Sequence, residues 1–291
     1  MSIKKIVISG TGCALADFLY NGVSFRGAAF SRYKSEKSGD GGLSPGKLVF
    51  TEELEKYSGQ SYAGILKEIT GNRPPDAFNV GGPSLVSLIH SSQMLDSHNF
   101  KVNFFGMAGK DEIGSRIFGL ARRTPLNIEN YLSTSLKPTP FTDVFSDSGY
   151  AGGHGERTFV NNIGAAWDYS PEHLSSSFFD SDIVCFGGTA LVPRIHDNLT
   201  ELLLKAKNRK CLTIVNTVFD FISEKKNPGS TWPIVNKPDQ YGLIDILIMD
   251  CEEALKISGQ QNIDNAADFF ATANVPCFII TDGANDLYGM S

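Results

Sequence analysis

The sequence is poor in cysteine, and this limits the classes to which it can belong. Its 291 residues include five cysteines, an odd number, with no C-x-x-C pair. Zinc sites and disulfide frameworks need cysteines at short, regular spacings, so the sequence disfavours both and favours a reducing compartment. Cys185, Cys211 and Cys277 lie in or beside apolar runs, where cysteine usually behaves as a small buried hydrophobe.

Clusters of basic residues and long apolar runs are also missing. The sequence has no Lys/Arg cluster with interleaved aromatic residues, and its net charge is −6. This disfavours a nucleic-acid surface but leaves room for a local nucleotide pocket. The N-terminal apolar run, within MSIKKIVISG, is too short for a signal peptide or a transmembrane helix. We therefore expect a cytoplasmic protein.

Two nucleotide and metal motifs are absent as well. The chain has no H-E-x-x-H, the zinc motif of metalloproteases, and no Walker-type G-x-x-x-x-G-K-[ST]. The glycine-rich segment GTGCAL (10–15) lacks the third glycine of G-x-G-x-x-G and the acidic residue that follows that motif. A dinucleotide or nucleotide-sugar enzyme on a Rossmann sheet is therefore a disfavoured alternative.

The chain alternates two kinds of segment. Short apolar, β-branched runs lie at residues 4–10, 101–109, 181–188, 211–217, 244–250 and 276–283. Amphipathic stretches lie at about 51–70, 83–96, 112–123, 195–208, 251–258 and 263–273. This alternation predicts an α/β fold in which a mostly parallel sheet is covered by helices on both faces. Ligand sites of such folds gather at the carboxyl ends of the strands.

Two segments interrupt this alternation. Residues 17–50 are polar and rich in glycine, and residues 133–162 carry alternating β-type residues around the turn GYAGGHGE. The second segment predicts a β-hairpin, and such an excursion often forms a lid over an active site. We therefore expect one α/β domain over residues 1–291, with β-lid excursions near 17–50 and 133–162.

Several residues are candidates for contact with a substrate. Asp17 follows the first strand, where a carboxylate can accept hydrogen bonds from substrate hydroxyls, and a helix cap or loop role is the alternative. Gly81 and Gly82 precede an apolar helix, so the backbone there either approaches a ligand or makes a tight turn. Arg157 lies at the hairpin tip and faces either substrate or solvent, and the nearby His154 is more often incidental than catalytic.

Two later strand ends carry polar residues. Asp250 and Glu253 end the apolar run IDILIM and lie three residues apart, hence on one helical face. Two carboxylates there can organise Mg²⁺ through its waters, and they equally have the form of a capping box. Thr281 and Gly283 close the run PCFIIT, where a hydroxyl and an amide can either touch nucleotide phosphates or form a turn.

Taken in order, these features resemble the ribokinase-like carbohydrate kinases, also called the phosphofructokinase-B (PfkB) family. Residues 12–17 are similar to the family's first-strand motif, and Gly81-Gly82 to its glycine pair. The stretch 102–114, ending G-K-D-E-I-G, resembles V-G-x-D-x-x-G, and G-E-R-T-F (155–159) resembles the lid hairpin. D-C-E-E (250–253) falls where the family has N-x-x-E, and T-D-G (281–283) falls on its T-x-G.

The resemblance implies a fold, a reaction and residue roles. The fold would be a three-layer α/β/α sandwich with a small β lid, and the reaction would be transfer of the ATP γ-phosphoryl group to a hydroxyl of a sugar or nucleoside. Asp17, Gly81, Gly82 and the lid's Arg157 would then serve the substrate. Asp250 and Glu253 would serve the Mg²⁺–phosphate waters, and Thr281 and Gly283 would serve ATP. Family lids commonly pair between subunits, which implies a homodimer.

The sequence also departs from the family pattern. The asparagine usually found a few residues after the glycine pair is Val86, and Asp250 brings a negative charge where the family has a neutral amide. The long insertion at 38–76 indicates a divergent subfamily and favours a nucleoside over a simple sugar as substrate.

The last motif, G-A-N-D (283–286), has two interpretations. If it were the family's G-A-G-D, Asp286 would be the catalytic base at the start of a helix. The position after T-x-G instead favours the opening of a hairpin, which would place the family base beyond Ser291. On this interpretation we expect an incomplete chain with little or no kinase activity, and the alternative is a non-catalytic sugar- or nucleoside-binding protein, a pseudo-kinase.

Overall fold

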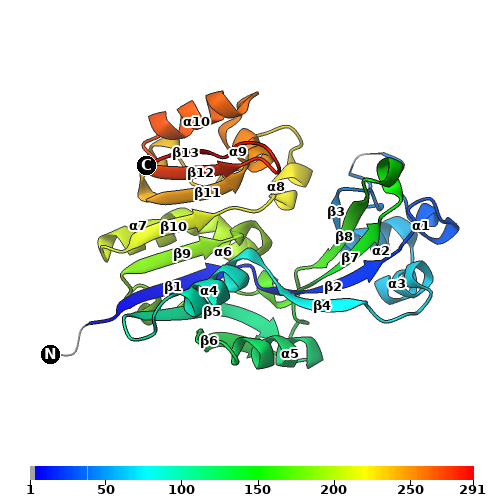
Figure 1. Ribbon diagram of the computed structural model, residues 1–291, viewed down its shortest axis with the longest axis horizontal. Helices are drawn as coiled ribbons and strands as arrows, with labels where there is room; N and C mark the ends of the chain where they lie inside the picture. Colours follow the sequence, from blue (N-terminus) through cyan, green and yellow to red (C-terminus); the bar gives the residue numbers. More distant parts are fainter. Residues whose placement is uncertain (1–3, 38) are drawn as a thin grey trace. The chain divides into compact units, whose positions relative to one another are not determined.

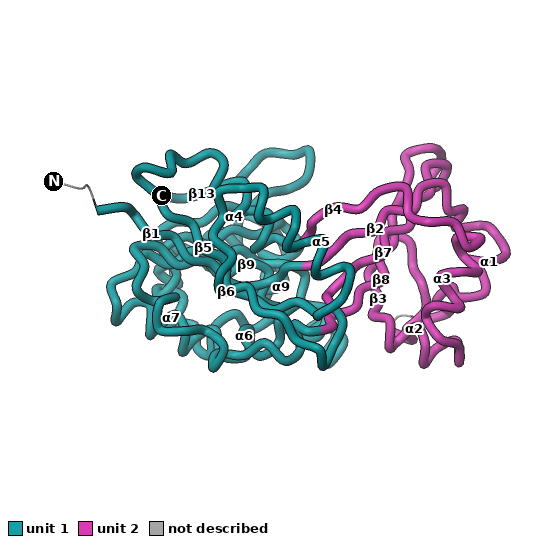
Figure 2. The backbone as a smooth tube through the Cα atoms, turned by 90° about the horizontal axis from the view of Figure 1, so that it is seen from below, with its two compact units in different colours: residues 1–14, 82–138, 165–291 teal, residues 15–81, 139–164 magenta. Residues whose placement is uncertain are grey.

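The computed structural model describes residues 4–37 and 39–291, which form two compact units (Figure 2). Of the described residues, unit 1 comprises 4–14, 82–138 and 165–291, and unit 2 comprises 15–37, 39–81 and 139–164. Residues 1–3, at the start of the predicted first strand, and residue 38, in the predicted first excursion, lie outside the described residues. No helix among the described residues is long and apolar enough to cross a membrane.

Unit 1 is built on an eight-stranded sheet in the order β13-β12-β11-β10-β9-β1-β5-β6 (Figure 1). Neighbouring strands are parallel except for β12 and β13. Each of the six apolar runs found in the sequence overlaps one of these strands. The bounds are β1 (Ile6–Gly12), β5 (Phe100–Gly109), β6 (Asn127–Thr134), β9 (Ile183–Gly187), β10 (Leu212–Asn216), β11 (Ile246–Asp250), β12 (Cys277–Thr281) and β13 (Tyr288–Met290).

Helices lie on both sides of this sheet, with α4 on one side and α6 and α7 on the other (Figure 2). Helix α4 packs closely on β1 because Gly10 has no side chain: a Cβ there would lie 2.5 Å from Cδ1 of Leu88. The bounds are α4 (Pro83–Met94), α5 (Glu112–Ala121), α6 (Pro193–Asp197), α7 (Leu199–Asn208), α8 (Phe221–Lys226), α9 (Cys251–Ser258) and α10 (Ile263–Thr272). Short 3₁₀ turns are η1 (Tyr150–Gly153), η2 (Gly164–Trp167), η3 (Pro171–His173), η4 (Ser176–Phe178), η5 (Thr189–Leu191) and η6 (Pro238–Leu243).

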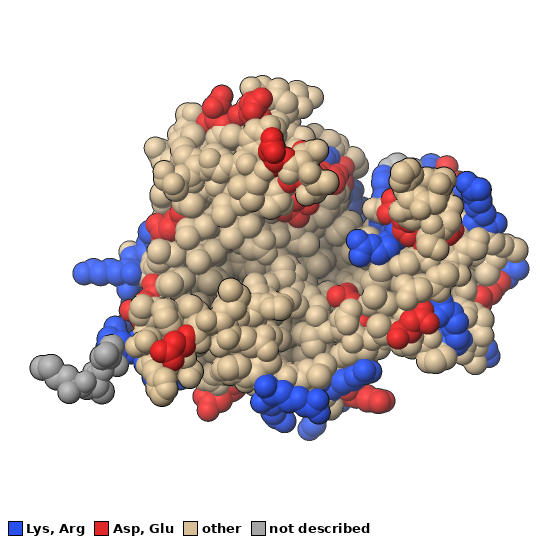
Figure 3. All heavy atoms as spheres, viewed as in Figure 1, with Lys and Arg blue, Asp and Glu red and all other residues tan. Residues whose placement is uncertain are grey.

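The two faces of the sheet are covered unequally. In β1, Ile8 and Ser9 point to opposite faces and both are buried. In β11, Leu247 is fully buried, whereas its neighbour Ile248 is only partly buried. The same difference separates Ile280 from Ile279 in β12, and Figure 3 shows a hollowed surface without charged side chains over β9 and β10. Within the described residues, cover on both faces therefore extends over β1 and β5 but is incomplete from β9 to β12.

Unit 2 has its own five-stranded sheet, in the order β3-β8-β7-β2-β4. The bounds are β2 (Leu15–Asn21), β3 (Leu48–Phe50), β4 (Ala77–Gly81), β7 (Phe141–Asp147) and β8 (Glu156–Asn162). The hairpin expected within 133–162 is β7 and β8, which pair antiparallel. The first excursion does not end near residue 50, because the helices α2 (Thr51–Ser58) and α3 (Tyr62–Thr70) and strand β4 also belong to unit 2.

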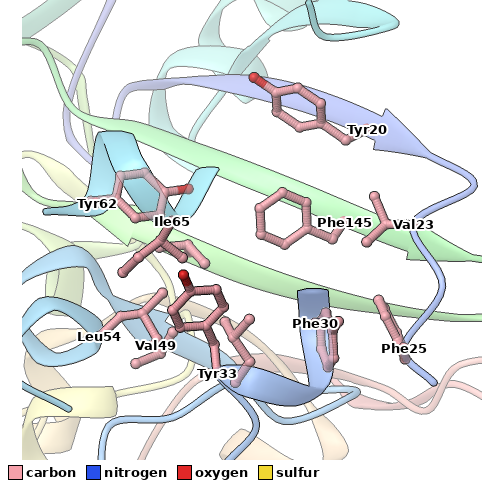
Figure 4. Close-up of a cluster of buried hydrophobic side chains, with 12 residues drawn as sticks. Tyr20, Val23, Phe25, Phe30, Tyr33, Val49, Leu54, Tyr62, Ile65 and Phe145 are labelled. Atoms are coloured by element: carbon pink, nitrogen blue, oxygen red, sulfur yellow. The ribbon is translucent and has the colours of Figure 1, made fainter. Parts of the chain in front are cut away.

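A separate hydrophobic core holds unit 2 together (Figure 4). Tyr20 of β2 and Phe145 of β7 supply the sheet side of this core, and Leu54 of α2 and Ile65 of α3 are both fully buried. Helix α1 (Ala28–Arg32) adds Phe30, which stacks on Phe25 with ring centroids 4.5 Å apart. Helices therefore cover one face of this sheet, and the residues that alternate with Tyr20 along β2, Asp17 among them, point to the other face.

Candidate active site

Asp17 and Gly81 of unit 2 lie side by side on neighbouring strands. In the antiparallel pair β2–β4, Leu15 is opposite Gly81 and Asp17 is opposite Asn79. The Asp17 carboxylate leans toward position 81, where a Cβ would lie 2.2 Å from its Oδ2 and 2.7 Å from Cδ1 of Leu15. Only glycine leaves space for the carboxylate in this position.

The Asp17 side chain is partly buried and forms no hydrogen bond or ion pair with any described residue. Burial raises its pKa from 3.8 to about 6, because the charged carboxylate loses hydration without gaining a donor. A carboxylate in this state has its full capacity to accept hydrogen bonds from a ligand.

Two further polar residues continue the row from Asp17 across the sheet. Thr142 of β7 is opposite Asp17, and Asn161 of β8 is opposite Thr142. Nδ2 of Asn161 donates a hydrogen bond of 2.8 Å to Oγ1 of Thr142. Sequence reasoning missed both residues, although the period-2 alternation of the two strands places them on one face once the hairpin register is known.

Arg157 lies far from Asp17 on the same face of the unit 2 sheet. The ladder places it two strands away and four residues farther along, roughly 16 Å by the spacing of strands and residues. Its guanidinium is exposed and lies over the ring of Phe159, 5.8 Å from the centroid. His154 is exposed in the turn before β8. The structure therefore does not bring Arg157 or His154 to Asp17.

Gly82 belongs to unit 1, where it caps the N-terminus of α4. Its φ of 87° is in the region that favours glycine, and a Cβ would lie 2.5 Å from the carbonyl oxygen of Cys13. At the same edge of the sheet, a Cβ at Gly12 would lie 1.9 Å from the carbonyl oxygen of Gly187. The carboxyl ends of β1 and β9 and the start of α4 thus meet through closely packed backbone, which leaves no room for side chains at these glycines.

Asp250 and Glu253 form the complete capping box that their spacing allowed. Oδ1 of Asp250 accepts from the Glu253 backbone N–H at 2.8 Å, and Oε2 of Glu253 accepts from the Asp250 N–H at 3.0 Å. Asp111, in the motif G-K-D-E-I-G, caps α5 with its side chain alone, accepting from the Gly114 N–H at 2.8 Å. These residues therefore fix the starts of α9 and α5.

Glu253 has a second partner that the sequence did not indicate. Thr217 follows β10, and its Oγ1 donates a hydrogen bond of 2.5 Å to Oε2 of Glu253. Glu253 is almost completely buried, and burial raises its pKa above the usual value of 4.5, while the bonds from Thr217 and the Asp250 N–H lower it. A polar residue directly after an apolar strand was the available signal for Thr217, since the ends of β10 and β11 are neighbours.

Thr281 lies beside Asp250, because these two residues are partners in the parallel ladder between β11 and β12. Both are exposed at the carboxyl edge of the sheet. Gly283 follows in a turn with φ 57°, and open space surrounds the position of its absent Cβ. Unit 1 thus brings Asp250, Glu253 and Thr281 together, with Gly283 two residues after the strand.

The segment G-A-N-D (283–286) lies in the connection between the antiparallel strands β12 and β13. The Asn285 N–H donates to the carbonyl of Asp282 at 2.8 Å, and Nδ2 of Asn285 donates to Oδ2 of Asp282 at 2.9 Å. The residues after Asp286 form β13 rather than a helix. This is the hairpin arrangement expected from the position of the segment after T-x-G.

The donor set at the β11 end suits magnesium bound through water. No cluster of three or more His, Cys, Asp or Glu side chains occurs among the described residues, so they do not build a full protein cage for a metal. Asp250 is exposed, and its Oδ2 forms no hydrogen bond within the described part of the chain. Mg²⁺ keeps most of its waters and is commonly held by one or two carboxylates together with substrate phosphates, which these residues fit.

The parallel α/β sheet of unit 1, with polar strand ends along one edge, and the β unit inserted into it define the ribokinase-like fold. The whole chain has the fold of an adenosine kinase from Anopheles gambiae (TM-score 0.71, 16% identity), solved with P1,P4-di(adenosine-5) tetraphosphate, the match covering 99% of this chain and 80% of that one. It is similarly related to a probable sugar kinase from Rhizobium etli (TM-score 0.71, 15% identity, 99% and 77% covered). A third neighbour is a fructokinase from Xylella fastidiosa with bound ATP (TM-score 0.63, 17% identity, 99% and 75% covered).

Residues 81–290 match the model of the pfkB family carbohydrate kinases. This is most of the chain, and the protein therefore belongs to that family. The fold and family that the sequence motifs predicted are both confirmed.

Proposed function

We propose that this protein is a kinase of sugar or nucleoside type, which transfers the γ-phosphoryl group of ATP to a hydroxyl group of its substrate. The observation that carries the proposal is the pair Asp17 and Gly81. A partly buried carboxylate without a donor costs free energy, and a glycine keeps the space beside it free. Substrate hydroxyls would supply the missing donors, and the neighbouring Thr142 and Asn161 offer further polar groups.

The nucleotide would bind at the carboxyl edge of the unit 1 sheet. Thr281 and Gly283 would contact ATP, the first through its exposed hydroxyl and the second through its amide. Asp250 and Glu253 would hold the waters of Mg²⁺, which supplies positive charge to the phosphates when it is bound. Glu253 is held in place by Thr217, so its orientation does not depend on the ligand.

The chemistry asked of the protein is mainly positioning. Phosphoryl transfer is accelerated by in-line placement of the acceptor hydroxyl and by charge stabilisation around the phosphates. Asp17 would orient the acceptor, while Gly81 and Gly82 let the backbone approach it. A nucleoside is our preferred substrate, since the long insertion of residues 38–76 becomes helices of unit 2 and adenosine kinases are among the structural neighbours. Arg157, if it serves the substrate, would contact a part distant from Asp17.

A second candidate function is binding without catalysis. It is favoured by the turn that holds residues 283–286, because Asp286 does not start a helix there and lacks the dipole that would support an anion hole. In this case the protein would bind a sugar or nucleoside and signal through unit 2.

Ligand binding tests the proposal without depending on turnover. Melting temperatures would be measured for a panel of sugars and nucleosides, with and without Mg·ATP. We expect at least one ligand that stabilises the protein, loses its effect in Asp17→Asn, and gains effect with Mg·ATP. A ligand whose binding ignores Mg·ATP would favour the non-catalytic protein, and a panel in which no sugar or nucleoside binds would contradict both.

Two features of the proposal concern the cell. We propose a homodimer formed through unit 2, where helices cover one face of the sheet, so the other face and the edge strands β3 and β4 remain for pairing. We also propose a cytoplasmic location, in keeping with five cysteines that form no disulfide.

A further inference from the structure

Unit 1 contains a small cavity lined by both polar and apolar side chains. Its volume is about 20 Å³, and residues at or just after the carboxyl ends of β9 and β10 line it. The polar residues that line it are Thr189, His196, Thr217 and Asp220, and the apolar ones include Trp232 and Ile257. A cavity of this size holds one water molecule, provided that the walls offer two to four polar partners.

Two atoms in the cavity wall have unmet hydrogen-bonding capacity. Nε2 of His196 and Oδ2 of Asp220 are buried and form no hydrogen bond with any described residue. They lie 3.6 Å apart, too far for a direct hydrogen bond and close enough for one molecule to bond both. Buried polar atoms of this kind nearly always have a partner, which is often an ordered water.

The other polar atoms of both side chains are already engaged. Nδ1 of His196 lies 2.9 Å from Oγ1 of Thr189, which fixes the ring on α6 against the end of β9. Oδ1 of Asp220 accepts from the Ser223 N–H at 2.9 Å and so caps α8. Asp220 is only 4% exposed, so bulk solvent does not satisfy its second oxygen. Both groups are therefore oriented toward the cavity by independent contacts.

The segment that carries Asp220 also carries Thr217, which bonds Glu253. The Thr217 N–H donates to the carbonyl of Ile248 at 2.9 Å, and its hydroxyl reaches Glu253 at 2.5 Å. Thr217 and Asp220 both line the cavity, so this short segment borders whatever the cavity holds. A bridge from His196 to Asp220 would connect the Asp220 end of this segment, through Thr189, to the end of β9.

We propose that one buried water molecule bridges Nε2 of His196 and Oδ2 of Asp220, and that these two side chains are positioning residues for Glu253. Hydrogen bonds would then connect Thr189 to His196, His196 to the water, and the water to Asp220. Asp220 lies in the segment that begins at Thr217. The inference rests on the proposed function only in its last link, the role of Glu253 near the Mg²⁺–phosphate waters. The water itself is independent of that function.

A high-resolution crystal structure of the 291-residue protein tests the first part. We expect density for a single water within hydrogen-bonding distance of both atoms. An empty cavity, a direct His196–Asp220 hydrogen bond or a bound cation would overturn the proposal.

Variants test the positioning role. Asp220→Asn keeps an oxygen to cap α8 but turns the cavity atom into a donor, and His196→Ala removes the opposite wall. Asp197→Asn changes an exposed carboxylate on the same helix as His196 and is the matched control. We expect the amides at 217–221 to exchange hydrogen faster in the first two variants than in the natural protein, and at an unchanged rate in the control. Unchanged exchange in Asp220→Asn would overturn the positioning role.

Titration with ATP separates this inference from the proposed function. Thr217→Val removes the direct bond to Glu253 and should weaken ATP binding roughly 10-fold with Mg²⁺ but not without it, the loss expected for one hydrogen bond to a charged group. Asp220→Asn and His196→Ala should also weaken ATP binding in the presence of Mg²⁺, by less than Thr217→Val does. If Thr217→Val has no effect, or the protein binds no Mg·ATP, the proposed role of Glu253 fails and exchange at 217–221 still decides the positioning. If only Thr217→Val has an effect, the positioning role fails and the proposed function stands.

Discussion

Gly81 and Asp17 compete for one small space, since any side chain at position 81 would put its Cβ 2.2 Å from Oδ2 of Asp17. The absence of a side chain at position 81 therefore makes room for the Asp17 carboxylate, in addition to allowing a turn. We predict that Gly81→Ala displaces the Asp17 side chain and weakens binding of the sugar or nucleoside about as much as Asp17→Asn does. Loss of hydrogen bonds to a charged group costs about 2 kcal/mol, or roughly a 30-fold rise in Kd by titration calorimetry.

The control for this prediction lies in the same unit. Gly64 is in helix α3, and a Cβ there would come no closer than 3.4 Å to Oγ of Ser61. Gly64→Ala should leave Kd unchanged and raise stability slightly, by up to about 1 kcal/mol. Equal affinities of Gly81→Ala and the natural protein would show that the carboxylate is not held where the structure places it.

Ligand affinity should depend on pH through Asp17. Its pKa in the free protein is raised to about 6, and ligand hydroxyls bond best to the ionised form. Affinity should therefore fall roughly 10-fold for each pH unit below about 6 and level off above 7. Kd measured from pH 5 to 8 gives this profile, which should be flat in Asp17→Asn. A natural protein that binds equally well at pH 5 and pH 8 would contradict the role of Asp17.

The core of unit 2 contains a second buried carboxylate that should control stability. Asp143 is 2% exposed and accepts a 2.5 Å hydrogen bond from the Tyr62 hydroxyl. Burial raises its pKa to about 7, and the Tyr62 bond offsets this only in part. Because the folded state binds this proton more tightly than the unfolded state does, the contribution of Asp143 to stability is highest at low pH and falls as pH rises from about 4 to about 7.

We predict that Asp143→Asn removes this fall. The variant should be as stable as the natural protein near pH 4 and more stable above pH 7, by an amount on the order of 4 kcal/mol. Urea denaturation across this range measures the difference. The exposed carboxylate Asp264 of α10 provides the control, since Asp264→Asn should leave the curve unchanged. A curve for Asp143→Asn parallel to that of the natural protein would contradict the raised pKa.

Asp286 should be dispensable. It is exposed in the connection between β12 and β13, and no helix follows it. We predict that Asp286→Asn changes neither ligand affinity nor any ATP turnover of the protein. ADP production in a coupled assay checks this, with Asp17→Asn as the variant that should alter binding. Readily measured turnover that Asp286→Asn abolishes would show that G-A-N-D is the catalytic turn after all.

The unequal cover of the unit 1 sheet predicts unequal effects of neighbouring substitutions. Leu247 is fully buried on the helix-covered face of β11, so Leu247→Ala should cost about 2–5 kcal/mol. Ile248 points to the other face and is only partly buried, and Ile248→Ala should cost about 1 kcal/mol. Urea denaturation compares the two. Equal losses would mean that this face of β11 is covered in solution.

The sequence predicted the main sheet well because strands such as β9 and β12 are short continuous apolar runs between turn residues. It was less informative about unit 2, because the amphipathic stretch 51–70 shows that its helices cover a sheet but not which sheet they cover. Asp250 and Glu253 were recognised as a pair, yet spacing could not reveal Thr217, whose place beside Glu253 depends on the pairing of β10 with β11. Likewise, a glycine pair indicates close approach of the backbone, but only the β2–β4 register shows that Gly81 makes room for Asp17.

The central claim is that Asp17 holds the acceptor of an ATP-dependent kinase, and one measurement tests it most directly. A sugar or nucleoside found in the ligand panel would be titrated calorimetrically into the protein and into Asp17→Asn, each with and without Mg²⁺ and a non-hydrolysable ATP analogue. We expect roughly 30-fold weaker binding to Asp17→Asn, and tighter binding to the natural protein when the analogue is present. Equal binding to both proteins, with no effect of the analogue, would contradict it.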